Sequence, residues 1–291
     1  MKLFKLGAAL LAAFTTFAVP HAASAATAAS KGKVLVVMSS ANSLDLKDGR
    51  KYSTGYYLNE FVVPYRKLVE AGYEPVIANP KGDVPVMDPN SNNKMFFGGD
   101  EAARADAFKY AQGVDLLKKT KTLASVVAEG TSGYVGVFVP GGHAPMADLL
   151  TDKNLGKILT SFHDTGRPTG IICHGPIVLL SALGDAEGFV KSMIANDGKA
   201  NSFAKGWPYA GYRVTVFSTG EEQALEGPGG LGGNVQFYPV NALAEAGAHV
   251  DSVANWHSNV IVDRELVTAQ QPFSAAEFGD VFVARLKAAK R

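Results

Sequence analysis

The stretch GIICHGPIVLL, residues 170–180, places the only cysteine of the chain between two apolar segments. GIIC is a short apolar run that predicts a buried strand. PIVLLSAL (176–183) predicts a helix with proline in its first turn, where proline is favoured. The sequence therefore predicts a sharp strand-to-helix turn at Cys173. Functional sites in open α/β sheets form beyond the carboxyl ends of the strands, which is where this turn puts the thiol.

Short apolar runs alternate with segments of helical spacing along the rest of the chain. Expected strands are 33–40, 73–79, 133–143, 170–173 and 213–218, with a hairpin over 260–270, and expected helices are 56–71, 107–127, 146–166, 176–183, 235–247 and 273–290. This alternation predicts an α/β fold, a parallel sheet covered by helices on both faces. Pro64 predicts a kink or break in the first helix. Segments 80–105 and 185–234 are expected to be inserted loops.

The first 25 residues have the three-part layout of a secretory signal peptide. MKLFK is basic, residues 6–19 are apolar, and Ala23-Ser24-Ala25 is a small-x-small cleavage signal. The apolar run is shorter than the roughly 20 residues that span a membrane. We therefore expect an exported protein, periplasmic or secreted, that begins near Ala26. Residues 26–291 are expected to form a single domain.

The charge of the chain is nearly balanced. Removing residues 1–25 takes two lysines from the 28 Lys and Arg residues and none of the 27 Asp and Glu residues, which leaves a net charge near −1. A nucleic-acid-binding domain would carry a basic patch. The composition therefore favours neither a nucleic-acid partner nor a membrane surface.

A single cysteine cannot form an internal disulfide, so the thiol is either an inert buried side chain or a reactive group. Free cysteine is among the most buried residue types, and the thiol alone does not decide between these readings. A helix N-terminus facing Cys173 would lower its pKa and favour the nucleophilic thiolate. The predicted turn resembles the nucleophile elbow of hydrolases, with cysteine in place of serine.

Three features near the predicted site favour a reactive thiol. Gly141 and Gly142 follow a predicted strand, so their N–H groups can form an oxyanion hole, although a Gly-Gly pair is more often only a turn. His174 is a candidate acid or base. Glu60 lies in a helix with many apolar residues, so it is either paired, functional or directed to solvent.

Four segments together resemble the ThiJ/PfpI superfamily, and especially its glyoxalase III and chaperone-like branch. They are TGYYLNEFVVPY (54–65), VFVPGGHAPMADL (137–149), GIICHGPIVLL (170–180) and VIVDRELVTAQQPFSAAEF (260–278), in the order of the family and over nearly the whole chain after residue 25. The resemblance implies a flavodoxin-like fold, shared with class I glutamine amidotransferases, and a homodimer. It assigns the nucleophile to Cys173, the following histidine to His174 and the glutamate of the first helix to Glu60. It places oxyanion or substrate binding at Gly141, Gly142 and His143.

The resemblance also implies a reaction on a small aldehyde without glutathione or any other cofactor. Cys173 would attack the aldehyde of methylglyoxal, and Glu60 or His174 would move a proton between the two carbons. Hydrolysis of the resulting thioester would give lactate. A carboxylate repels a neighbouring thiolate, so one group of the Glu60–Cys173 pair should hold a proton.

Two details differ from the family pattern. Ala144 follows His143 where the branch often has glycine, which can change what His143 reaches. Residues 80–105 contain acids but no histidine, and the chain has no H-x-x-x-H spacing, so we predict no metal.

Other functions remain open. A glutamine amidotransferase needs a late His-x-Glu, whereas this chain has His257-Ser258-Asn259. Peptidase activity would require a pocket built across subunits. A holding chaperone needs no acid or base, and an oxidant sensor would use the thiol through a sulfenic acid.

A few remaining side chains are candidates for the edge of the site. His257 has the best chance of reaching it among the other histidines. Core packing is preferred over a place at a pocket mouth for Trp207, Tyr209, Phe237 and Trp256.

Overall fold

The computed structural model describes residues 30–289, so the predicted signal peptide lies outside the described part and stays a prediction. The strands are β1 (Lys33–Val37), β2 (Ser43–Asp45), β3 (Lys51–Ser53), β4 (Glu74–Asn79), β5 (Lys121–Thr122), β6 (Tyr134–Val139), β7 (Thr169–Ile172), β8 (Arg213–Val214), β9 (His249–Val250), β10 (Val260–Asp263) and β11 (Leu266–Ala269). The α-helices are α1 (Leu58–Glu70), α2 (Glu101–Gly113), α3 (Leu123–Glu129), α4 (Lys153–Asp164), α5 (Ala186–Ala195), α6 (Thr219–Leu225), α7 (Pro239–Glu245) and α8 (Ala275–Ala288). None of these helices is long and apolar enough to cross a membrane.

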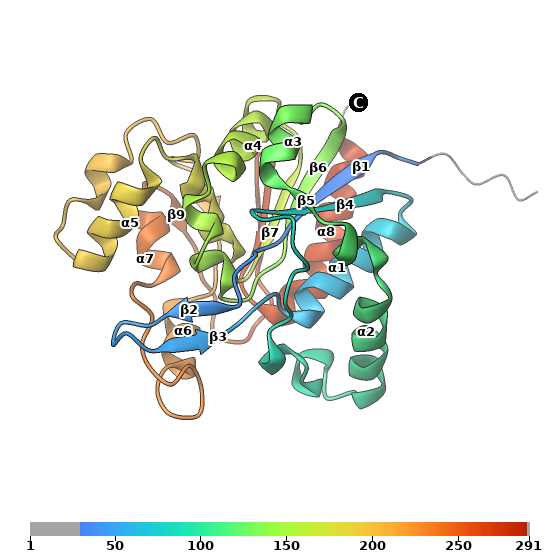
Figure 1. The fold of residues 1–291 in the computed structure, drawn as a ribbon, viewed down its shortest axis with the longest axis horizontal. Coiled ribbons are helices and arrows are strands. Elements are labelled where there is room, and N and C mark those ends of the chain that lie inside the picture. Colours follow the sequence, from blue (N-terminus) through green and yellow to red (C-terminus); the bar gives the residue numbers. More distant parts are fainter. Residues whose placement is uncertain (1–29, 290–291) are drawn as a thin grey trace, which may run out of the picture.

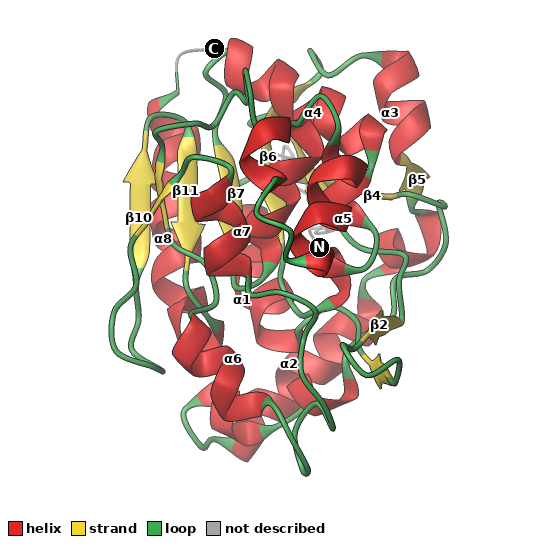
Figure 2. Ribbon diagram, turned by 90° about the vertical axis from the view of Figure 1, so that its left-hand side faces the viewer, coloured by secondary structure: helices red, strands yellow, loops and turns green. Residues whose placement is uncertain are grey.

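The main sheet has the strand order β10-β11-β7-β6-β1-β4-β5. Every pairing in it is parallel except that of the hairpin strand β10 with β11. Figure 2 shows β10, β11 and β7 side by side at one edge. The predicted α/β fold with a largely parallel sheet is confirmed, as is the hairpin over 260–270.

Helices bury both faces of this sheet (Figure 1). On β1, Val34 and Val36 belong to the apolar cluster that also contains residues of α1, α2 and α8. Leu35 and Val37 belong to the cluster with residues of α3, α4, α5 and α7. Successive strand residues point to opposite faces, so an all-apolar strand such as β1 must be covered on both sides.

The first helix is continuous through Pro64, so a break there is wrong, whereas the alternative of a kink stays a prediction. Proline removes the N–H that would bond to the carbonyl four residues earlier, which here is that of Glu60. The helix persists because tertiary packing holds it. A side-chain carbon placed on Gly279 of α8 would lie only 3.2 Å from the Cα of Pro64, so the two helices touch there. Gly72 ends the segment with φ of 88°, as expected.

Two other predicted elements are wrong. The helix expected over 107–127 is three pieces, because α2 ends at Gly113, a 3₁₀ turn follows, and β5 intervenes before α3. The strand expected over 213–218 is reduced to the two residues of β8, which pair with β9 outside the main sheet. The hairpin strand β11 already occupies the edge of β7, so this segment has no place in the main sheet.

The two segments expected to be loops contain regular structure. Segment 80–105 holds the short 3₁₀ helices η1 (Pro89–Ser91) and η2 (Lys94–Phe97) and the start of α2. Segment 185–234 holds α5, the 3₁₀ helix η7 (Ala200–Phe203), β8 and α6. The expected mature single domain over 26–291 stays a prediction.

Close packing of β7 against α8 gives a first testable prediction. A Cβ at Gly170 would lie 2.6 Å from Cδ2 of Phe282, whereas a Cβ at Gly184 would meet nothing within 4 Å. We expect Gly170→Ala to lower the free energy of unfolding by about 1–3 kcal/mol, the usual cost of overpacking a core. Chemical denaturation measures it, with Gly184→Ala as the matched control. Equal stability of the two variants would contradict this packing.

Candidate active site

The thiol lies on a strained turn at the carboxyl end of β7. Cys173 has a φ of 65°, a left-handed conformation that is uncommon outside glycine. Its N–H donates to the Ala269 carbonyl at 2.8 Å, and its carbonyl accepts from the Phe217 N–H at 2.9 Å. The side chain is only 2% exposed. Strain held in place by such contacts is common at functional sites, and the predicted turn is confirmed. The segment that follows, η6 (Gly175–Ala182), is a 3₁₀ helix rather than an α-helix.

Backbone groups surround the sulfur as the oxyanion prediction requires. The N–H groups of Gly142 and His174 both reach the Cys173 sulfur and act to lower its pKa. Gly141 packs so tightly that a Cβ there would lie 2.5 Å from the Cβ of Cys173 and 2.5 Å from Oε2 of Glu60. Glycine at this position therefore lets the carboxyl and the thiol approach each other.

Glu60 is fully buried in the first helix and faces the thiol. Burial raises its pKa to about 8, and contacts with the Cys173 thiol and the Gly141 backbone only partly oppose the rise. Neither carboxyl oxygen makes a full hydrogen bond with another described residue. At neutral pH the carboxyl therefore holds a proton, in line with the expectation that one group of the pair does.

The expectation of a depressed thiol pKa is wrong. Burial, and then repulsion by the Glu60 carboxylate, raise the pKa of Cys173 well above its ordinary value. The two backbone N–H groups do not outweigh these effects. The thiol at rest is neutral, and a base must remove its proton when it reacts.

His174 is placed to be that base. Its Nδ1 lies 3.3 Å from the Cys173 sulfur, and its Nε2 lies 2.8 Å from Oε2 of Glu222. Burial lowers the pKa of His174 to about 4, so the ring is neutral at pH 7. An ionised carboxylate only accepts hydrogen bonds, so Nε2 carries the proton and Nδ1 is free to accept one from sulfur. The three residues form a Cys–His–Glu arrangement.

Glu222 is the residue that the sequence analysis missed. Burial alone would raise its pKa, but His143 and His174 outweigh this and hold the pKa well below its usual range. Ser218 and Glu221 form a capping box that starts α6 and so fixes the next residue in the first helical turn. That S-x-x-E pattern was the available signal for the helix. Nothing in the sequence shows that the helix lies against His174.

His143 engages the other oxygen of the same carboxylate. Its Nε2 lies 2.7 Å from Oε1 of Glu222, and its ring centroid lies 3.9 Å from that of His174. Ala144 is fully buried and begins a short 3₁₀ turn, and its presence does not prevent His143 from reaching the site.

The same three side chains are a candidate metal-binding group. One ligand atom from each of His143, His174 and Glu222 lies within 4.8 Å of the others. A His-x-x-x-H spacing does not reveal this group, because the two histidines are 31 positions apart along the chain. Both Nε2 atoms already bond to the carboxylate, so a metal ion would have to displace two N–H protons.

The segment after β4 supplies one wall of the site. Asp88, fully buried, accepts from the Thr54 hydroxyl at 2.9 Å and from the Asn90 N–H at 2.8 Å. The ring of Tyr57 contacts that of Phe96 at 5.1 Å between centroids. Burial raises the pKa of the Tyr57 hydroxyl, and Asp88, Cys173 and Glu60 in their ionised forms raise it further. Tyr57 therefore lies near all three groups.

Other candidates lie outside the site. His257 is exposed, and its Nδ1 contacts the carbonyl of Asn255. Trp207 and Tyr209 are core residues, as preferred. Trp256 is 37% exposed and packs on Phe217, whose ring stacks on His174 at 4.4 Å. Phe237 is partly buried against the core.

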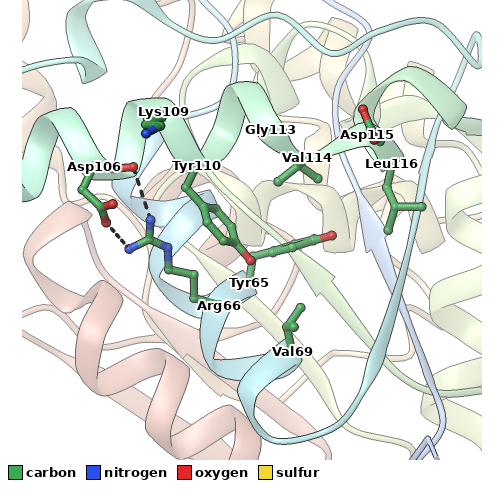
Figure 3. A pocket seen from close by; sticks show the side chains of 10 residues that line it. All are labelled: Tyr65, Arg66, Val69, Asp106, Lys109, Tyr110, Gly113, Val114, Asp115 and Leu116. Atoms are coloured by element: carbon green, nitrogen blue, oxygen red, sulfur yellow. Dashed lines mark hydrogen bonds and ion pairs between the residues drawn. The ribbon is translucent and has the colours of Figure 1, made fainter. Parts of the chain in front are cut away.

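A surface pocket of about 500 Å³ lies between α1 and α2, away from this chemistry (Figure 3). Arg66 lies over the ring of Tyr110 at 4.2 Å and donates to Asp106 at 2.6 Å. None of the site residues described above lines this pocket. It is therefore separate from the candidate active site around Cys173.

Comparison with known proteins agrees with this geometry. Residues 53–188, which include Glu60, His143 and Cys173, match the model of the DJ-1/PfpI family. The chain contains a DJ-1/PfpI family domain. The resemblance drawn from the four sequence segments is confirmed.

Some relatives of this chain have names that describe a function. The protein/nucleic acid deglycase HchA of Staphylococcus aureus (strain JH9) is 27% identical over 257 residues, covering 87% of this chain and 79% of the relative. Glyoxalase III of Candida albicans has a TM-score of 0.63 at 23% identity, over 89% of this chain and 99% of that one. Rapid Encystment Protein 24 kDa of Francisella tularensis has a TM-score of 0.63 at 24% identity, over 88% and 99%. The two solved structures show the shared fold.

The name of the staphylococcal relative is that of an enzyme, and such relatives suggest enzyme activity in this family. The name of the staphylococcal relative includes nucleic acid, which does not agree with the expectation of no nucleic-acid partner. The homodimer stays a prediction.

The coupling of the two buried acids gives a second prediction. Because the Glu60 carboxylate adds to the effect of burial in raising the pKa of Cys173, we expect Glu60→Gln to lower that pKa. The pH dependence of iodoacetamide alkylation measures it, since Cys173 is the only thiol. Glu74→Gln, at an exposed acid of β4, is the control. A pKa that is unchanged or higher in Glu60→Gln would contradict the coupling.

Proposed function

We propose that this protein is a cysteine-dependent, glutathione-independent glyoxalase III-like enzyme. It would convert methylglyoxal or related α-oxoaldehydes into 2-hydroxy acids. The observation that carries the proposal is the protonated Glu60 carboxyl beside a thiol that has its own base, His174. Moving a hydrogen between two adjacent carbons needs a group that both gives and takes a proton near pH 7, and a pKa of about 8 suits that task.

The first step uses the triad. His174 Nδ1 takes the thiol proton, and the Cys173 sulfur attacks the aldehyde carbon. The developing oxyanion is held by the N–H groups of Gly142 and His174 and receives the proton of Glu60. The product is a hemithioacetal, with Glu60 now a carboxylate.

The second step uses the carboxylate that the first step created. Glu60 takes the hydrogen of the former aldehyde carbon and returns a proton to the neighbouring carbon. The protonated His174 supplies a proton to the second oxygen and takes up the proton of the first hydroxyl, so His174 stays protonated. The hemithioacetal thereby becomes its isomer, a lactoyl thioester on Cys173. Water then cleaves the thioester to lactate and the free thiol.

A second candidate reaction is deglycase activity, which the name of the staphylococcal relative favours. The thiol is only 2% exposed. This burial suits a small aldehyde better than a carbonyl adduct attached to a macromolecule. A deglycase reaction would therefore require the wall around Tyr57 to open.

The burial also argues against the oxidant-sensor alternative. Sensor thiols are accessible and have low pKa values. Here the thiol is buried and its pKa is raised. A holding chaperone would need none of Glu60, His174 and Glu222, and this polar cluster favours catalysis.

The test is lactate formation from methylglyoxal without glutathione. We expect the purified protein to produce lactate, and Cys173→Ala, Glu60→Gln and Glu222→Gln each to lose at least about 10²-fold in kcat/KM. Glu74→Gln is the exposed control. No lactate from folded wild type, or full activity in Glu60→Gln, would overturn the proposal.

A further inference from the structure

One buried nitrogen of the site has no partner. His143 is 3% exposed, and its Nε2 bonds to Glu222. Its Nδ1 is buried and makes no hydrogen bond with any residue between 30 and 289. A buried polar atom without a partner destabilises the fold, so its presence needs a physical reason.

Neighbouring polar groups do not satisfy this nitrogen. Asp88 lies near His143, but its two carboxylate oxygens accept from Thr54 and Asn90. Tyr52 meets the ring of His143 edge-on at 5.5 Å, and its hydroxyl accepts from the Asn90 side chain. The free nitrogen is therefore available to a ligand.

His143 stands beside the reacting sulfur. It follows Gly142, whose N–H reaches the Cys173 sulfur, and its ring packs on His174, which also touches that sulfur. Both histidines use Nε2 on the same carboxylate. His143 thus repeats the His174–Glu222 pair, except that its Nδ1 faces no thiol.

We propose that His143 is a second catalytic base, which activates the water that cleaves the thioester on Cys173. The inference rests on the proposed function and assigns its last step. His174 serves the thiol, His143 serves the water, and Glu222 orients both rings.

The step balances as follows. His143 Nδ1 takes a proton from water while the water oxygen bonds to the acyl carbon and the carbonyl electrons move to oxygen. When these electrons form the carbonyl again, the carbon–sulfur bond breaks, and the sulfur leaves as a thiolate. The thiolate receives the proton that His174 carries from the earlier steps, since His174 Nδ1 lies 3.3 Å from the sulfur, and His143 passes its own proton to solvent. The products are lactic acid and the neutral thiol, and the Glu222 carboxylate stabilises the transient imidazolium.

Two substitutions separate the two nitrogens of His143. The amide nitrogen of glutamine can take the place of Nε2 and still donate to Glu222, but glutamine has no group at Nδ1. Asparagine can replace Nδ1 but cannot reach Glu222. His249→Asn, at an exposed histidine of β9, is the control.

The experiment follows both half-reactions. Wild type, His143→Gln, His143→Asn and His249→Asn are mixed with methylglyoxal, quenched and analysed by mass spectrometry. Hydroxylamine cleavage distinguishes the thioester from the hemithioacetal. p-Nitrophenyl acetate is the second probe, because it acylates the thiol without the glyoxalase steps.

We expect His143→Gln to form the thioester at nearly the wild-type rate, to accumulate it, and to turn over about 10²–10⁴-fold more slowly. His143→Asn should slow acylation as well, because Glu222 loses one donor. Equal slowing of acylation and turnover in His143→Gln, or unchanged turnover, would overturn the inference.

The two proposals fail in different ways. Failure of the proposed function appears in wild type, as no lactate from methylglyoxal. Failure of this inference appears as equal deacylation rates in wild type and His143→Gln. p-Nitrophenyl acetate measures these two rates even when methylglyoxal gives no lactate. Wild type that forms no acyl-enzyme with either compound would overturn both.

Discussion

The site depends on one constraint, the burial of a carboxyl and a thiol side by side. Burial raises the pKa values of both Glu60 and Cys173, and the Glu60 carboxylate, once ionised, raises that of Cys173 further. The pair therefore rests with its protons in place. Reaction requires neighbours that remove and return protons on demand, and His174 with Glu222 provides them. The chemistry assigned to this protein follows from that arrangement.

The fold brings the groups together from segments that are distant in sequence. The first helix carries Glu60, the end of β6 leads into Gly141, and the turn after β7 holds Cys173. The absence of a side chain at Gly141 allows the carboxyl and the thiol to meet. Parallel strands end at the same edge of a sheet, so two of the three segments converge there without further contacts.

The sequence predicted what depends on local pattern. The apolar runs predicted the strands of the main sheet except β5, and the turn around Cys173 followed from an apolar strand that leads directly into a helix beginning with proline. The continuity of α1 through Pro64 was not predictable, because contacts with α8 decide it. Glu222 was missed for the same reason, since a capping box places the helix start but not its neighbour. The thiol pKa was predicted with the wrong sign, because the depth of burial is a tertiary property.

The most direct test is the protonation state of Glu60. Infrared difference spectra of wild type and Glu60→Gln isolate its carboxyl band from those of the other acids. The account predicts a protonated carboxyl at pH 7 that ionises with a midpoint near 8. A carboxylate at pH 7, with a midpoint near the ordinary value of 4.5, would contradict it.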